Sequence, residues 1–131
     1  MQSLVAVVDD DVSVRESLES FIRSAGLRAR VFASAEEFLK SPDSHNTACL
    51  LLDLQLPGMN GNELHRNLLA NGNATPVIFV TAHVSDEEAR RQALSDGAVA
   101  YLSKPFEEAE LLEAIETALR RNVKQEKGSQ S

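Results

Sequence analysis

Four short apolar runs in this chain end on side chains that could carry out phosphoryl chemistry. The runs cover residues 4–8, 48–52, 77–80 and 99–102. The polar side chains that follow them are Asp9, Asp10 and Asp11, then Asp53, then Thr81, then Ser103 and Lys104. In an open parallel sheet, functional groups collect at the carboxyl ends of the strands. One cleft should therefore hold several carboxylates, one hydroxyl and one amine, which together suit a magnesium and phosphoryl site.

The carboxylates of Asp9, Asp10 and Asp53 predict a cation site. Three acids at adjacent strand ends repel one another and lose solvation, so such a cluster needs a cation. Oxygen-only ligands suit Mg²⁺, and Mn²⁺ could take its place. Asp11 is better explained as a cap for the first helix, where an aspartate matches the helix dipole.

Asp53 is the candidate nucleophile of this site. No helix begins directly after it, because the pair 57–58 (Pro-Gly) forces a turn first. An aspartate in this setting can form an aspartyl phosphate. Lys104 would pair with Asp53 at rest and with phosphate oxygens afterwards. Pro105 would aim the lysine, and an X–Pro bond can be cis at modest cost. The Thr81 hydroxyl can donate to a phosphoryl oxygen.

Apolar runs alternate with amphipathic segments along the whole chain. Strands are expected near residues 4–8, 28–32, 48–53, 76–80 and 99–102, the second of them at a sheet edge. Apolar residues at helical spacing mark five helices, near residues 14–22, 35–39, 64–69, 89–94 and 111–119. This order predicts an α/β fold: a five-stranded parallel doubly wound sheet with helices on both faces.

The 131 residues predict one domain over residues 1–121, followed by a polar linker or tail over residues 122–131. A formal net charge of −7 argues against nucleic-acid binding by this segment. Cys49 falls inside a strand and is expected in the core. One cysteine, no signal peptide and no membrane span suit a cytoplasmic protein. His45 and His65 are expected at the surface, and His83 could overhang the site.

Several motifs resemble the receiver domain of two-component response regulators. They are Asp9-Asp10 after a strand, the segment Asp53 to Gly61 (DLQLPGMNG), Thr81-Ala82 and Lys104-Pro105-Phe106. The resemblance covers about residues 3–121. It implies the flavodoxin-like strand order 2-1-3-4-5. The segments 8–11 (VDDD), 32–39 (FASAEEFL) and 76–83 (PVIFVTAH) are most similar to FixJ-type regulators.

This resemblance assigns roles to the site residues. It implies that Asp53 accepts phosphate from a histidine kinase, and that Asp9, Asp10 and the Gln55 carbonyl hold Mg²⁺. It further implies that Lys104 contacts the phosphate and that Thr81 and Tyr101 form a switch. The domain would then be regulatory, catalysing only its own phosphorylation and dephosphorylation. Gln55 and His83 each lie two residues beyond a phosphate-contacting residue, so they are expected to change the lifetime of the phosphoryl group.

FixJ-type regulators also suggest partners. Phosphorylation would change the face made by the fourth helix, the fifth strand and the fifth helix, including Arg91 and Ser95, and would promote a homodimer. DNA is expected as a partner only through a C-terminal helix-turn-helix domain, which does not follow Arg121 in this sequence. No membrane partner is expected.

Two other interpretations of the same residues stay open on the sequence alone. A haloacid-dehalogenase-type phosphatase would use Asp9 and Asp11 in a motif that residues 9–13 (DDDVS) nearly fit. That family needs further acidic residues after the lysine, whereas the last aspartate of this chain is Asp96. The phosphatase interpretation also leaves Asp53 unexplained. A flavin-binding module needs a loop that cradles phosphate after the first strand, where three aspartates would repel it.

Overall fold

Alternating strands and helices build the whole of the computed structural model, which describes residues 3–82 and 87–130, the last nine of them as backbone only. The strands are β1 (Leu4–Val8), β2 (Arg28–Phe32), β3 (Cys49–Leu52), β4 (Val77–Thr81) and β5 (Ala100–Ser103). The helices are α1 (Val12–Ser24), α2 (Ala35–Lys40), α3 (Gly61–Ala70), α4 (Glu87–Ser95) and α5 (Glu108–Gln130), with a 3₁₀ turn, η1 (Pro42–His45). Every predicted strand and helix is present, and the boundaries differ by a few residues except at the end of α5, which extends well beyond the predicted helix.

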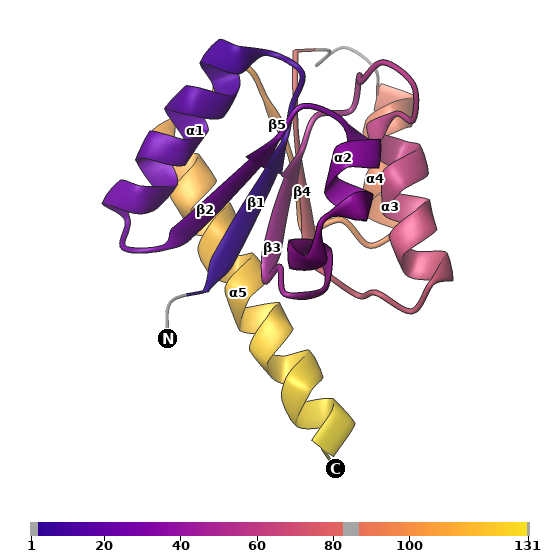
Figure 1. The fold of residues 1–131 in the computed structure, drawn as a ribbon. Helices are drawn as coiled ribbons and strands as arrows, with labels where there is room; N and C mark the ends of the chain where they lie inside the picture. Colours follow the sequence, from indigo (N-terminus) through magenta and orange to yellow (C-terminus); the bar gives the residue numbers. More distant parts are fainter. Residues whose placement is uncertain (1–2, 83–86, 131) are drawn as a thin grey trace.

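The strands form one parallel sheet in the order β2-β1-β3-β4-β5 (Figure 1). This confirms the predicted fold class and strand order. The central strands β1, β3 and β4 are buried at every position, because helices cover both faces of the sheet. Strand β2 lies at an edge and alternates exposed and buried residues, as its arginines at positions 28 and 30 predicted.

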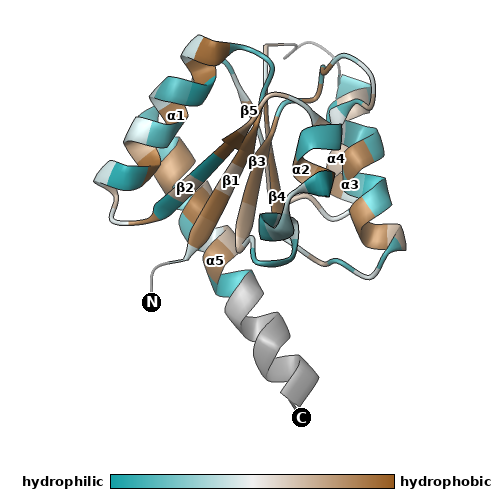
Figure 2. Cartoon of the chain, in the orientation of Figure 1, coloured by the Kyte–Doolittle hydropathy of each residue, from teal (hydrophilic) through white to brown (hydrophobic). Residues whose placement is uncertain are grey.

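Two apolar layers hold the helices against the sheet. Helices α1 and α5 pack on one face, where Leu18, Ile22, Leu111 and Ile115 are almost fully buried. Helices α2, α3 and α4 cover the other face (Figure 1). Figure 2 shows mostly hydrophobic strands at the centre, flanked by helices in which hydrophobic and hydrophilic residues alternate. Aliphatic side chains make most of this core, since the chain has no tryptophan and few aromatic residues.

Capping residues fix where the helices begin. Asp11 caps α1, and its side chain accepts hydrogen bonds from the N–H groups of Ser13 and Val14. Ser34 caps α2, and its side chain accepts a hydrogen bond from the N–H of Glu37. Helix α3 begins at Gly61, and its cap was not predicted: Asn60 forms a capping box with Glu63.

Helix α5 continues to Gln130, through the segment predicted to be a polar tail. The domain boundary at residue 121 therefore stays a prediction. Over the residues that the structure describes, no helix combines the length and the apolar character that crossing a membrane requires.

Candidate phosphoacceptor site

The register of the sheet brings the aspartates together at the carboxyl ends of β1 and β3. Val8 lies opposite Leu52, so the residues that follow them, Asp9 and Asp53, are neighbours. The backbone N–H of Asp53 donates to the Val8 carbonyl at 3.0 Å. Asp9 and Asp53 are only 2% and 7% exposed, whereas Asp10 is exposed. One carboxylate oxygen from each of the three lies within 4.8 Å of the others, an arrangement that could hold a metal ion.

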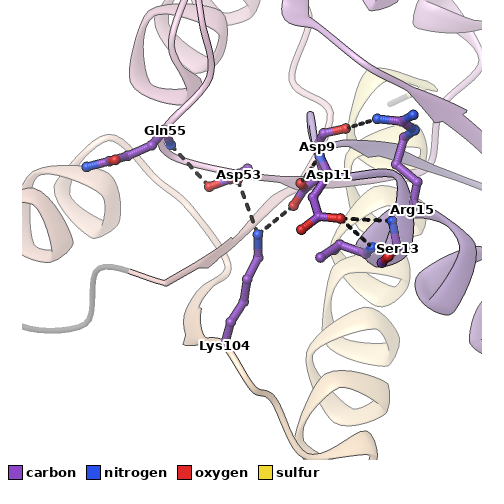
Figure 3. Close-up of polar contacts among 8 residues, drawn as sticks. Asp9, Asp11, Ser13, Arg15, Asp53, Gln55 and Lys104 are labelled. Carbon is purple, nitrogen blue, oxygen red and sulfur yellow. Dashed lines mark hydrogen bonds and ion pairs between the residues drawn. The ribbon is translucent and has the colours of Figure 1, made fainter.

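Lys104 reaches these acids from the end of β5. Its backbone N–H donates to the carbonyl of Thr81 at 2.8 Å, which ties the end of β5 to the end of β4. Its Nζ lies 2.7 Å from Asp9 Oδ2 and 3.2 Å from Asp53 Oδ2 (Figure 3). The pair with Asp53 was expected, but the shorter contact with Asp9 was not. The Lys104–Pro105 peptide bond is cis.

Burial and charge shift the proton affinities of this group. Burial raises the pKa of Asp53, and the charge of Asp9 adds to that effect, while hydrogen bonds from Gln55 and Lys104 oppose it. For Lys104, burial alone would lower the pKa, but the Asp9 and Asp53 carboxylates outweigh it and hold the pKa above its usual value. Three carboxylates and one ammonium leave a formal charge of −2, which a divalent cation would cancel.

Backbone and helix donors orient the two buried acids. Asp9 Oδ1 accepts from the N–H of Asp11 at 2.9 Å, and Asp53 Oδ1 accepts from the N–H of Gln55 at 3.1 Å. Arg15 of α1 donates from Nη1 to the Asp9 carbonyl at 2.8 Å (Figure 3). Arg15 was not predicted as a site residue. It lies four residues after Asp11, one helical turn into α1, from where its side chain reaches back to Asp9. Asp11, which the phosphatase interpretation needs as a catalytic acid, serves as the helix cap.

Gly61, the first residue of α3, allows that helix to begin directly against the backbone of Asp53. A Cβ at this position would lie 2.9 Å from the Leu54 Cα and would overlap the carbonyl oxygen of Asp53. The Gly61 N–H donates to the Leu54 carbonyl at 3.0 Å. Only glycine permits so close an approach, whereas the sequence pattern predicted only a helix near residues 64–69.

The other predicted site residues lie around this centre. Thr81 is fully buried at the end of β4, and Gln55 is exposed beside Asp53. Tyr101 on β5 is partly buried, with its ring 6.2 Å from the Phe79 ring. His83 falls outside the described residues, so its predicted place over the site stays a prediction.

His65 was wrongly expected at the surface. Its side chain is 3% exposed and its ring stands edge-on to Phe79, at 5.8 Å between ring centres. Burial lowers the pKa of His65; the charge of Asp96 opposes that shift and the charge of Arg66 adds to it. His65 lies four residues after Gly61 and three before Leu68, which are both buried, so helical spacing places it on the inner face of α3. His45 is exposed, as expected.

Comparison with known proteins gives a consistent result. Residues 5–116 match the family model of the response regulator receiver domain. Nodulation protein W of Bradyrhizobium diazoefficiens is 42% identical over 94% of this chain and 54% of its own length. The solved structure of the response regulator StyR is 42% identical, with a TM-score of 0.88 over 99% of this chain and 65% of that one. The crystal structure of FixJ-N is 36% identical, with a TM-score of 0.81 over 92% of this chain and 95% of that one. The chain spans about half the length of the curated relatives that it matches.

Proposed function

Because this chain belongs to the family of response regulator receiver domains, we propose that it accepts a phosphoryl group on Asp53 from a histidine kinase. The observation that supports this most is a buried Asp53 paired with Lys104 beside two further acids. The family is regulatory, so the proposed reaction is a signalling step and not turnover of a substrate. Phosphoryl transfer, its dependence on Mg²⁺ and its consequences are all parts of the proposal.

Asp9, Asp10, Asp53 and the Gln55 carbonyl would hold the Mg²⁺. The set fits a hard dication because it offers only oxygen ligands and carries a formal charge of −2 with Lys104 included. A bound Mg²⁺ supplies neutralisation of phosphoryl oxygens during transfer. The exposed Asp10 and Gln55 leave the site open on the side from which the cation and the donor would enter.

The chain's own residues carry out the transfer. An Asp53 carboxylate oxygen forms a bond to phosphorus while the bond between phosphorus and the kinase imidazole nitrogen breaks, and the imidazole leaves. The Lys104 ammonium, now 3.2 Å from Asp53 Oδ2, can turn to a phosphoryl oxygen. The Thr81 hydroxyl can donate to another. Gln55 and His83 are proposed to set how fast water removes the group again.

Phosphorylation is proposed to be read out through Thr81 and Tyr101. As Thr81 moves toward the phosphoryl group, the Tyr101 ring can fill the space beside β4, against Phe79. The two positions of Tyr101 form a two-state element that the phosphoryl group biases. The face made by α4, β5 and α5, including Arg91 and Ser95, would then support a homodimer.

The kinase is proposed to dock over the groove beside Lys104. This groove is lined by residues of α1 and of the segment after β5: Ser13, Val14, Ser17, Phe21, Lys104, Pro105, Phe106 and Glu108. Lys104, which lines this groove, also pairs with Asp53, so a partner seated there would bring its phosphohistidine close to Asp53. Control of transcription would require a DNA-binding domain in addition to this receiver domain, as in FixJ-type regulators. A cytoplasmic location is also proposed, and it suits the buried free thiol of Cys49.

Intact-mass measurement with acetyl phosphate tests the proposal. The wild-type chain with Mg²⁺ should gain one phosphoryl group, and Asp53→Asn should gain none. Asp10→Ala should lose Mg²⁺ binding in a calorimetric titration. Undiminished phosphorylation of Asp53→Asn would show that the nucleophile lies elsewhere, and Mg²⁺ binding by Asp10→Ala equal to that of wild type would show that the cation pocket is wrong.

Sedimentation with and without beryllofluoride, which mimics the phosphoryl group, tests the readout. The wild-type chain should dimerise with the mimic, and Thr81→Ala should dimerise less. A wild-type chain that stays monomeric at high concentration with the mimic bound would refute the dimer. Unchanged hydrogen exchange around Tyr101 would refute the switch.

A further inference from the structure

Glu36 connects α2 to the loop that follows Asp53. Its Oε2 accepts a hydrogen bond from the backbone N–H of Met59 at 3.0 Å, across 23 residues of sequence. Gly58, just before Met59, has φ of +74°, a conformation that favours glycine. A Cβ on Gly58 would lie 2.8 Å from the same Oε2. The backbone turn and the carboxylate therefore fit closely against each other.

The loop of residues 54–60 links the nucleophile to α3 and is fixed at three places. At its start, the Gln55 N–H holds Asp53 Oδ1. At its end, Asn60 caps α3, and the Gly61 N–H returns to the Leu54 carbonyl. Glu36 holds the stretch between these two anchors. Without that bond, the exposed residues Pro57 and Gly58 would have more freedom, and the neighbouring Gln55 with them.

A carboxylate suits this role better than an uncharged side chain. Hydrogen bonds from backbone N–H groups, that of Met59 first, lower the pKa of Glu36, so the ionised form makes the contact. A hydrogen bond to an ionised acceptor is shorter and stronger than one between neutral groups. Glu37, its neighbour in the same turn of α2, is also exposed, but within the described part of the chain its carboxylate makes no hydrogen bond or ion pair.

We propose that Glu36 is a positioning residue for the cation and phosphoacceptor site, acting through the turn at Gly58 and Met59. By fixing that turn, it keeps the Gln55 carbonyl and the Asp53 carboxylate in the arrangement that binds Mg²⁺. Glu36 itself touches neither the cation nor the phosphoryl group. The inference rests on the proposed function, because it names a residue that prepares the same site.

Four proteins test it: wild type, Glu36→Ala, Glu36→Gln and Glu37→Ala. Glu36→Ala should weaken Mg²⁺ binding on the order of threefold to tenfold, which is less than the roughly 10- to 100-fold loss typical of direct partners of metal ligands, because Glu36 bonds to Met59 and not to a ligand. Amide exchange at Met59, measured without metal, should become faster in the same variant. Glu36→Gln keeps an acceptor oxygen and should recover most of both properties. Glu37→Ala removes the same charge from the same turn and should match wild type.

The outcomes separate this inference from the function on which it rests. Mg²⁺ affinity and Met59 exchange in Glu36→Ala equal to those in the wild type would overturn the role of Glu36 while leaving the proposed function intact. Equal losses in Glu36→Ala and Glu37→Ala would also overturn it, since general charge would then explain the effect. A wild-type chain that binds no Mg²⁺ and takes no phosphoryl group from acetyl phosphate would overturn the proposed function itself.

Discussion

Replacing Asp53 with asparagine should stabilise the metal-free protein. In the wild type, Asp53 is buried beside Asp9, and one Lys104 ammonium serves both carboxylates. Asparagine keeps nearly the same shape and removes one negative charge. Its carbonyl oxygen still accepts the hydrogen bond that the Gln55 N–H now gives to Asp53 Oδ1. The substitution should therefore relieve repulsion without leaving a backbone donor unpaired.

The size of the effect follows from two opposing contributions. One oxygen of Asp53 lies within 4.8 Å of one of Asp9, and two unit charges at that distance repel by about 3.5 kcal/mol at an effective dielectric constant of about 20. Asp53 also loses its 3.2 Å contact with Lys104, and a hydrogen bond between charged groups contributes about 2 kcal/mol. The difference predicts that the free energy of unfolding rises by about 1.5 kcal/mol.

The stabilisation should depend on pH and on Mg²⁺. Because burial and Asp9 raise the pKa of Asp53, the folded protein binds this proton more tightly than the unfolded chain does. The wild type then loses stability as the pH rises through that raised pKa, and the loss is absent below the pKa of the unfolded chain. The advantage of Asp53→Asn should be complete at pH 7 and should shrink toward acid pH. Added Mg²⁺ should close the gap by stabilising the wild type.

Urea unfolding followed by circular dichroism measures the free energy of unfolding of both proteins. It is carried out at several pH values, in chelator and then in Mg²⁺. Asp10→Asn is the matched control: it removes a charge from the same cluster at an exposed position, so it should stabilise less. Should Asp53→Asn prove less stable than the wild type at pH 7 in chelator, then pairing with Lys104 outweighs repulsion by Asp9, and the expected sign is wrong.

Three further substitutions test other parts of the structure. Gly61→Ala should cost about 1 to 3 kcal/mol of unfolding free energy, since its Cβ would overlap the Asp53 carbonyl; it should also slow phosphorylation by acetyl phosphate, and an unchanged protein would refute the close approach. Lys104→Met should lower the free energy of unfolding by about 2 to 3 kcal/mol in chelator. The loss should be smaller than for breaking a fully buried ion pair, because the Lys104 side chain is 19% exposed, and Mg²⁺ should restore part of the lost stability. His65→Leu should flatten the pH dependence of stability near neutrality: burial lowers the pKa of His65, so wild-type stability falls as the pH drops through the unfolded value of about 6.5, and identical pH profiles in urea unfolding would contradict that assignment.

Much of the fold was predictable because each strand carries its own signal. Runs such as residues 4–8 and 77–80 are apolar throughout, as strands buried on both faces must be. The acids that follow β1 and β3 needed only the rule that parallel strands end at one edge of the sheet. The pairing of Lys104 with Asp53 followed from the same rule.

What escaped prediction depends on contacts between elements. The bond from Glu36 to the N–H of Met59 involves a backbone donor, and no sequence pattern marks which acid will find it. The 2.7 Å contact between Lys104 and Asp9 depends on the exact reach of β5. His65 was misplaced because a histidine is polar in any pattern, while its actual environment is set by how α3 lies against Phe79.

The ion pair between Lys104 and Asp9 joins residues that are 95 positions apart. Asp53 stands midway, so the site draws on the beginning, the middle and the end of the domain. During synthesis, the first half of the chain can leave the ribosome with its aspartates in place but with no lysine beside them. An incomplete or unfolded domain therefore presents no assembled acceptor. A kinase that depends on this geometry would phosphorylate only chains in which this domain has folded. The phosphorylated form would therefore consist of folded domains alone.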